Sequence, residues 1–351
     1  MYPSVKILKK ACKKYNYNFW VIDNVSKNLF QVTNWNKYFF ANNQRTGMFP
    51  INSHFSSSVV ADKAFCYQVL EKHWYKIPRW SHFFINSKYS WYISKSNQEK
   101  NIYKFVKDLG YPVFMKPNNW SLGRWAEVIY NKKGLKNHIE NIKDIWDICL
   151  VQEYIKAPEY RIFVVNWEIQ FSYKRSAASI KWDWKSSIKK LLKKSSNSIL
   201  KKNSFFLNEL KNKNLTLDSI LDVNVSISLH SKTNISAGWD ISELTTKHGK
   251  KVKKWVEQVV SKFDIWVTGI DVFAPNWINS PKDFIIIELN SNPSLVWTYK
   301  LWYKKLVYKI WKKILESYFW KNKHYNKNRK HRKILDKKTE IKKSKKIKSS
   351  V

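Results

Sequence analysis

The chain has 351 residues, enough for one large domain or two to three smaller lobes with an ample core. Its 65 Lys and Arg residues against 26 Asp and Glu residues give a formal net charge of +39. The three cysteines are isolated, which argues against a disulfide framework and a zinc site. The N-terminus has no long apolar stretch of the kind found in secretory signals, and the chain has no run of roughly 18 apolar residues that could span a membrane. We therefore expect a cytoplasmic protein without membrane contact.

Helical and strand-like patterns alternate along the chain. Apolar residues at helical spacing predict helices, and short apolar runs beside turn residues predict strands. In chain order we expect a helix over 6–15, strands over 29–33 and 37–41, helices over 62–72 and 97–109, strands over 111–116 and 150–155, a hairpin of 161–165 with 168–174, helices over 185–194 and 250–263, adjacent strands over 268–274 and 284–290, and a helix over 300–319. This order favours an α+β fold over a regular parallel sheet.

Tryptophan is unusually frequent and stands where a chain needs glycine. There are 19 Trp and 7 Gly, whereas an average usage of about 7% gives roughly 25 Gly in a chain of this length. Trp35 and Trp167 each follow an asparagine between two strand-like runs, the place of an Asn-Gly hairpin turn. A Trp at positive φ is disfavoured because its Cβ collides with the backbone. Two hypotheses follow: many of these residues are glycines encoded by a reassigned UGA codon, or the protein is genuinely rich in aromatic residues.

Two apolar strands carry oxygen ligands that suit a metal ion. Three isoleucines at 285–287 precede Glu288 and Asn290, which share one face of a strand because they are two residues apart. The upstream strand contributes Asp271. Carboxylate and amide oxygens are hard ligands that suit Mg²⁺, which usually binds together with nucleotide phosphates. The set predicts ATP with one or two Mg²⁺ ions, for which Mn²⁺ is a substitute; the alternative is that these side chains are simply solvated.

Two other segments have the character of a nucleotide site. Lys116 ends an apolar strand, from which its ammonium can reach phosphate oxygens. With glycine at positions 120 and 125, the loop that follows would be Gly-rich, and its backbone N–H groups could cover phosphates. Glu153 lies near the end of another strand, where an acidic group can bind an adenine amine and ribose hydroxyls. An ordinary surface residue is the alternative for both Lys116 and Glu153.

The order of these motifs resembles the ATP-grasp superfamily, in particular the ATP-grasp module of cyanophycin synthetases and of bifunctional glutathione synthetases. The resemblance extends from residue 34 to residue 301. It rests on Ala61-Asp62-Lys63, on Lys116-Pro117 with the loop to Trp125, on residues 153–155, 160–165, 180–188 and 234–240, and on the pair of strands that carries Asp271 and Glu288. It implies an ATP-grasp fold in which two α+β lobes, residues 61–155 and 156–320, hold the nucleotide between them. A short N-terminal α/β segment, 1–60, would precede the lobes, and a basic disordered tail, 321–351, would follow them.

The resemblance further implies an ATP-dependent carboxylate–amine ligase that forms an amide bond through an acyl phosphate, acting on an amino acid or short peptide. Such chemistry depends on positioning and charge neutralisation more than on a covalent nucleophile. The residues implied to bind the nucleotide are Lys63, Lys116, Ser121 and Gly123 for the phosphates, Glu153 with the backbone of Tyr154 and Ile155 for adenine, and Glu159 for the ribose or its neighbourhood. Arg161 and Arg175 would lie near the nucleotide or acyl phosphate, and the metal ligands would be Asp271, Glu288 and Asn290.

Two other functions compete with the ligase. The high net charge and the basic tail favour a nucleic-acid-binding protein on a degenerate ATP-grasp scaffold, with steeply salt-dependent RNA binding. A grasp-fold kinase that stops at a phosphorylated product is the third function. The sequence identifies neither the acid nor the amine, and a homo-oligomer is one option for the oligomeric state.

Overall fold

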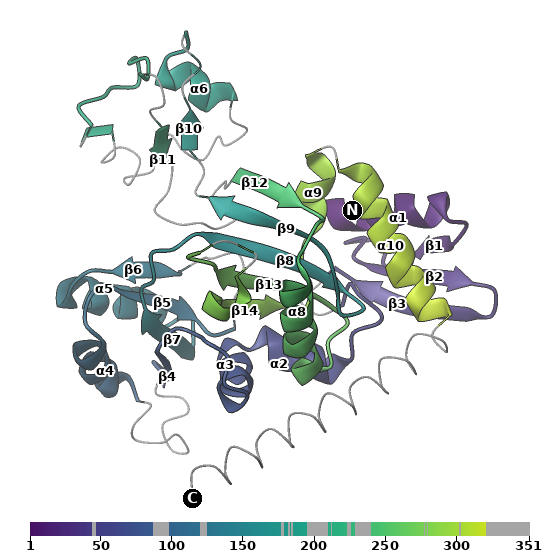
Figure 1. Cartoon of the computed structure of the whole chain (residues 1–351), viewed down its shortest axis with the longest axis horizontal. Coiled ribbons are helices and arrows are strands. Elements are labelled where there is room, and N and C mark those ends of the chain that lie inside the picture. The colour runs from purple at the N-terminus through teal and green to yellow at the C-terminus, as the bar shows by residue number, and fades with distance from the viewer. Residues whose placement is uncertain are drawn as a thin grey trace, which may run out of the picture.

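The computed structural model describes residues 1–43, 47–86, 98–119, 125–176, 179–181, 183, 185–194, 210–211, 213–222, 226–228, 240–276, 278, 280–301 and 303–320. In this part of the chain, helices and antiparallel sheets form an α+β fold, as predicted (Figure 1). The strands form sheets of three, four and five strands and a separate two-stranded ribbon.

The N-terminal segment forms a helix and the three-stranded sheet. Helix α1 (Pro3–Lys14) precedes β1 (Asn18–Val21), β2 (Leu29–Asn34) and β3 (Lys37–Asn42), which pair in that order. The predicted hairpin of 29–33 with 37–41 is confirmed. The helix begins earlier than predicted because Pro3 suits a first helical turn. Its apolar side packs with this sheet and with α10 (Lys304–Phe319).

The four-stranded sheet contains the strand of Lys116. Its order is β4 (Trp80–Phe84), β7 (Ile148–Glu153), β5 (Val113–Pro117) and β6 (Glu127–Ile129). Helices α4 (Ile102–Leu109) and α5 (Lys132–Ile142) contribute to the core of this sheet. Helix α4 follows a short 3₁₀ turn, Glu99–Asn101, and ends at Gly110, whose positive φ of 84° favours glycine.

The five-stranded sheet contains the predicted metal strands. Its order is β12 (Asp240–Thr245), β9 (Glu168–Ser176), β8 (Glu159–Val165), β13 (Val267–Phe273) and β14 (Ile285–Asn290). The predicted hairpin and the predicted neighbouring strands are confirmed. Helix α8 (Lys250–Phe263) packs Val252, Val256 and Val259 against one face, together with side chains of α2 (His54–Ala61) and α3 (Lys63–Lys72). Helix α10 packs against part of the opposite face.

Some predicted boundaries are wrong. The helix predicted over 300–319 is two helices, α9 (Val296–Lys300) and α10, and α6 (Ile188–Lys194) is shorter than its prediction. Helix α6 lies with β10 (Ser179–Lys181) and β11 (Ser226–Ser228) apart from the main body, at the top of Figure 1. The predicted tail, 321–351, is outside the described residues. Within the described ranges, no helix is both long and apolar enough to cross a membrane.

Among the described residues, four tryptophans adopt positive φ, a conformation that large side chains avoid. The φ angles are 52° at Trp35, 61° at Trp74, 59° at Trp125 and 65° at Trp167. Trp35 lies in the two-residue connection between β2 and β3, and Trp167 lies in the one between β8 and β9. The other non-glycine residues with positive φ in the described ranges are Asn, Asp, Lys or Glu. The two predicted turns are therefore formed, with tryptophan in a glycine conformation.

Candidate active site

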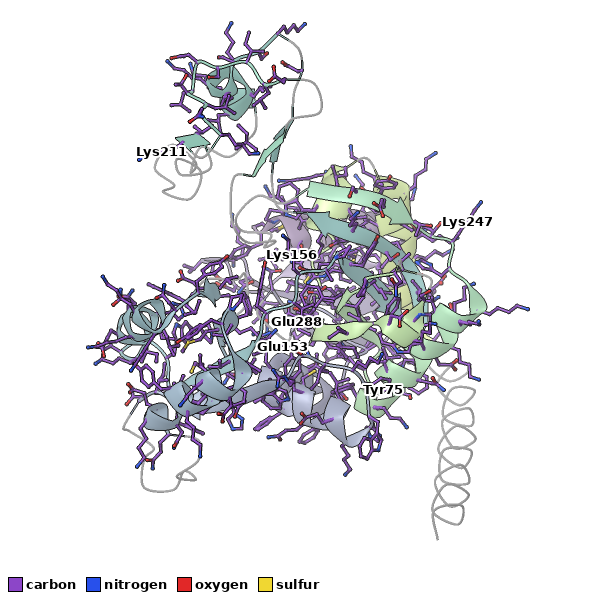
Figure 2. The ribbon with its side chains drawn as sticks, turned by 60° about the vertical axis from the view of Figure 1, so that its left-hand side comes forward. Tyr75, Glu153, Lys156, Lys211, Lys247 and Glu288 are labelled. Atoms are coloured by element: carbon purple, nitrogen blue, oxygen red, sulfur yellow. The ribbon has the colours of Figure 1, made fainter. Side chains whose placement is uncertain are left out.

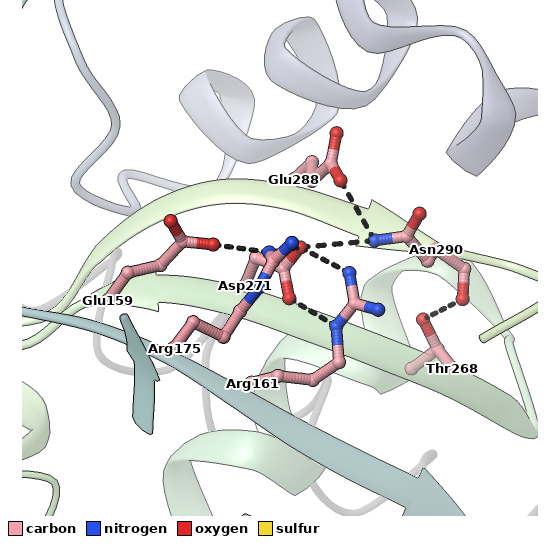
Figure 3. Close-up of polar contacts among 7 residues, drawn as sticks. All are labelled: Glu159, Arg161, Arg175, Thr268, Asp271, Glu288 and Asn290. Carbon is pink, nitrogen blue, oxygen red and sulfur yellow. Dashed lines mark hydrogen bonds and ion pairs between the residues drawn. The ribbon is translucent and has the colours of Figure 1, made fainter. Parts of the chain in front are cut away.

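Sheet register brings charged residues from four strands onto one face of the five-stranded sheet. Asp271 on β13 lies opposite both Arg161 on β8 and Glu288 on β14. Glu159 on β8 lies opposite Arg175 on β9. Directly opposed residues share a face, and so do residues two apart on one strand. The side chains of all five residues therefore meet beside β13, as Figure 3 shows.

The two arginines form a buried ion network with two carboxylates. Arg161 Nε and Nη2 donate to Asp271 Oδ1 and Oδ2 at 2.6 and 2.5 Å. Arg175 Nη1 donates to Asp271 Oδ2 at 2.9 Å and also pairs with Glu159. These four side chains are each no more than 9% exposed. Two positive and two negative charges are thus removed from water together. Each of them has an oppositely charged partner, which offsets the cost of burying it.

The end of β14 supplies oxygen ligands next to this network. Asn290 Nδ2 donates to Glu288 Oε1 at 3.1 Å and to Asp271 Oδ2 at 3.4 Å. Asp271 Oδ1 accepts one bond from Arg161, so this oxygen retains acceptor capacity. The set of Asp271 Oδ1, the Glu288 carboxylate and the Asn290 amide oxygen fits Mg²⁺ by its chemistry. The described part of the chain has no group of three or more His, Cys, Asp or Glu side chains that could hold a metal ion, so a metal here would need other ligands such as phosphates.

Two lysines lie on the other side of Glu288. Lys63 begins α3, and its Nζ donates to the backbone oxygen of Asn118 at 3.1 Å. Lys116 is buried in β5, with its Nζ 5.4 Å from the centre of the Tyr67 ring. Burial lowers the pKa of Lys116 to about 8, and the positive charge of Lys63 adds to this effect, although Glu288 opposes it. Two cations next to one carboxylate form a site that attracts polyphosphate.

The charge of Glu288 is set by its neighbours. Burial by itself would raise the pKa of this carboxyl, because it disfavours the charged form. The positive charges of Lys63, Lys116 and Arg161 outweigh burial and lower the pKa to about 2. Glu288 is therefore ionised at neutral pH, as a metal ligand has to be.

A cavity of about 380 Å³ opens beside Lys63, Glu288 and Asn290. Its walls come from α1, the segment after β3, the junction of α2 and α3, the end of β14 with the loop that follows, and α10. This volume lies within the range of small-molecule sites. Lys63 and Glu288 are the charged residues of its wall, and Ile7, Met48 and Trp311 are among the apolar ones.

Glu153 lies at a separate place, at the end of β7. Its carboxylate accepts the Arg79 backbone N–H at 2.8 Å and lies 3.6 Å from Arg79 Nε. Tyr154 and Ile155 follow the strand instead of ending it. Figure 2 labels Glu153 and Glu288 in the central part of the molecule, where the four- and five-stranded sheets approach each other. Ser121 and Gly123 are outside the described residues, and so are residues 234–239 of the resembling loop.

Sequence reasoning missed two residues that connect α3 to the strands around this site. The Asn118 side chain accepts the Ala64 N–H at 2.9 Å and donates to Asp62 Oδ2 at 2.7 Å. Tyr67 donates its hydroxyl proton to the backbone oxygen of Ile287 at 2.7 Å. The position of Asn118 directly after Lys116-Pro117 could have indicated its role in the site. Nothing in the sequence distinguishes Tyr67 from an ordinary helix residue.

Known proteins resemble this chain in fold and in sequence. A bifunctional glutathione synthetase from Pasteurella multocida matches 84% of the chain with a TM-score of 0.55 and 19% identity, over 40% of its own length. Among curated proteins, the glutathione biosynthesis bifunctional protein GshAB of Streptococcus mutans is 23% identical over 256 residues, which cover 67% of this chain and 32% of that protein. The GshAB protein of Listeria monocytogenes serotype 4b is 24% identical over 198 residues, or 52% of this chain. No family model matches the chain.

The chain has the fold of the ATP-grasp superfamily, and its sequence similarity to GshAB proteins supports the same resemblance. Its two larger sheets, with Lys116 on one and Asp271 and Glu288 on the other, have the α+β architecture of the ATP-grasp fold. The chain spans about a quarter to a third of the length of the curated GshAB relatives that it matches. The resemblance to the ATP-grasp superfamily inferred from the sequence motifs is therefore confirmed.

Proposed function

We propose that this chain is an ATP- and Mg²⁺-dependent ligase that joins a carboxylate to an amine, with release of ADP. The carboxylate is that of an amino acid or short peptide and becomes an acyl phosphate before the amine attacks it. The observation that carries this proposal is the array of buried Lys63 and Lys116 with half-buried Glu288 beside the two arginines. The similarity to GshAB proteins, whose name assigns them to glutathione biosynthesis, supports an amide-forming reaction on a peptide-like substrate.

Each group of residues has one task in this proposal. Lys63 and Lys116 bind phosphate oxygens as point charges, and the end of β7 at Glu153 receives the adenine. Glu288, Asn290 and Asp271 hold Mg²⁺, which supplies neutralisation of phosphate charge when it is bound. Arg161 and Arg175 stabilise the negative charge of the transferring phosphoryl group and of the tetrahedral intermediate. The cavity next to Glu288 receives the acid substrate.

We propose that the two larger sheets are the cores of two lobes, residues 61–155 and 156–320, with the nucleotide between them. Strands β4 to β7 lie within the first range and strands β8 to β14 within the second. Residues 1–60 then form the segment that covers the substrate cavity, since Ser4, Ile7 and Phe49 are among its walls.

The proposal is tested by incubating the protein with ATP, Mg²⁺ and pools of amino acids. ADP and phosphate should appear together with an amide product in the mass spectrum. ADP with a stable phosphorylated product and no amide would instead indicate a kinase. Steeply salt-dependent RNA binding without ATP binding would favour the nucleic-acid function.

Lys116 should make ATP binding depend on pH. The pKa of this lysine is lowered to about 8, so its ammonium is charged below that pH and neutral above it. Only the charged form attracts phosphate, and ATP affinity should therefore fall as pH rises through 8, by up to about tenfold per pH unit. Calorimetric titration of ATP between pH 7 and 9.5 measures this fall.

Lys116→Arg is the matched control for the pH dependence, because a guanidinium remains protonated throughout this range. The affinity of the variant should stay level between pH 7 and 9.5. A wild-type affinity that does not change over the same range would contradict the assignment of Lys116 to the phosphates.

A further inference from the structure

The buried ion network contains a carboxylate, Glu159, that the sequence motifs assign to the ribose. In the structure its carboxylate pairs with Arg175. Glu159 begins β8, is 8% exposed, and pairs with Arg175 on the neighbouring strand. Glu153, at the end of β7 on the other sheet, is the carboxylate that lies at the expected adenine end.

Each arginine of the network is fixed by a carboxylate from a neighbouring strand. Arg175 Nη1 lies between the Glu159 carboxylate and Asp271 Oδ2. Asp271 also holds Arg161 through two parallel hydrogen bonds, a geometry that fixes the plane of the guanidinium. Long arginine side chains lose much rotamer freedom when they bind a ligand, and a network formed beforehand removes this cost from the reaction.

We propose that Glu159 is a positioning residue, which holds Arg175 on the sheet face beside Asp271 and Glu288. Glu159 acts through Arg175 and does not contact the nucleotide. This inference rests on the proposed ligase function, in which the arginines stabilise the phosphoryl group and the tetrahedral intermediate. Preorganised cations contribute most where charge develops during the reaction. Loss of this positioning should therefore lower kcat more than it weakens ATP binding.

Glu159→Gln tests the inference because the amide keeps the size of the side chain and removes its charge. The variant should lower kcat at least tenfold and change the dissociation constant of ATP less than twofold. Glu159→Asp keeps the charge and should recover part of kcat. Glu168→Gln is the control, since Glu168 lies on β9 but pairs with Lys313 at an exposed place. A tenfold weaker ATP affinity with unchanged kcat would assign Glu159 to the ribose and overturn the inference.

A second readout does not depend on catalysis. Thermal unfolding of Glu159→Gln, Arg175→Gln and the double variant measures whether the two side chains act as a pair. The loss in Tm of the double variant should be clearly smaller than the sum of the two single losses. Additive losses in Tm would overturn the inferred pairing of Glu159 with Arg175. A wild-type protein that binds no ATP would contradict the proposed function, but the unfolding measurement would still test the pairing.

An independent inference comes from Trp74, which the sequence did not single out. Helix α3 ends at Lys72; the Trp74 N–H then donates to the oxygen of Glu71 at 2.9 Å, and the Tyr75 N–H donates to that of Leu70 at 3.1 Å. These two bonds define a Schellman motif, whose left-handed residue is usually glycine. Trp74 is 85% exposed, so burial of its ring does little to offset the unfavourable backbone conformation.

We infer that glycine stands at positions 35, 74, 125 and 167 in the native polypeptide, through translation of UGA as glycine. These positions belong to unrelated local structures, two hairpin turns, a helix end and a loop before β6, and share a positive φ. Asn166 and Trp167 both have positive φ, the conformation of an Asn-Gly turn. The Trp167 indole N–H is also buried without a hydrogen-bond partner, which a glycine would avoid.

Peptide mass spectrometry of the protein purified from its source organism tests this inference. Glycine masses are expected at the four positions, and tryptophan masses would overturn it. In a recombinant protein that carries tryptophan at the four positions, Trp74→Gly should raise Tm by about 2–4 °C. The substitution removes the unfavourable backbone conformation of Trp74, and little packing is lost because the ring is exposed. Trp320→Gly is the control: Trp320 is exposed at the end of α10 with a φ of −115°, so glycine brings no gain there. A Tm for Trp74→Gly that does not exceed the wild-type value would also contradict the inference.

Discussion

Glu288→Gln is expected to lower ATP-dependent ADP release by roughly two orders of magnitude or more. Glu288 is ionised, lies between the two lysines and the arginine network, and borders the cavity next to Asn290. The glutamine keeps the shape of the side chain but loses the charge that would hold Mg²⁺ and balance Lys63 and Lys116. A coupled assay of ADP release with ATP, Mg²⁺ and amino acids measures the loss.

Glu243→Gln is the matched control for this experiment. Glu243 is on β12 of the same sheet but pairs with Lys174 near the surface, with its side chain 41% exposed. Its replacement should leave ADP release within about twofold of the wild-type rate, because exposed ion pairs contribute little. ADP release that survives Glu288→Gln would refute the assignment of the site.

Asp271→Asn is expected to lower the free energy of unfolding by about 3–5 kcal/mol. The Asp271 side chain is 1% exposed and accepts hydrogen bonds from both Arg161 and Arg175. Removal of its charge leaves two buried guanidinium groups in the network with one anion, Glu159, to balance their two positive charges. Uncompensated buried charge is costly because the protein interior solvates it poorly. Urea denaturation of the wild type and the variant measures the difference.

The comparison variant for Asp271→Asn is Glu168→Gln. It removes an ion pair in which the Glu168 side chain is 70% exposed, and the expected loss is less than about 1 kcal/mol. A loss of that small size for Asp271→Asn would mean that water reaches the two arginines. The network would then not be a fixed arrangement.

Local pattern made much of the fold predictable. The hairpins around Trp35 and Trp167, helix α8 and the strand pair β13 and β14 follow from apolar periodicity and turn residues, which act over a few positions. Helix boundaries failed where a single residue or a tertiary contact decides them, as at the break between α9 and α10. Short strands such as β6 and β12 were missed because segments of three to six residues carry little periodic signal.

The sequence by itself determined which chemical groups are present and which of them share a strand face. Glu288 and Asn290 are two residues apart, and this spacing fixes their common side before any folding. The tertiary structure decided which groups meet. The resemblance implied the ribose or its neighbourhood for Glu159, and only the pairing of β8 with β9 revealed that it lies opposite Arg175. That pairing depends on sheet register, and a shift of one residue would turn every side chain of a strand to the other face. Register is set by packing and by irregularities such as the shift after Asp271, which involve residues far apart in the chain.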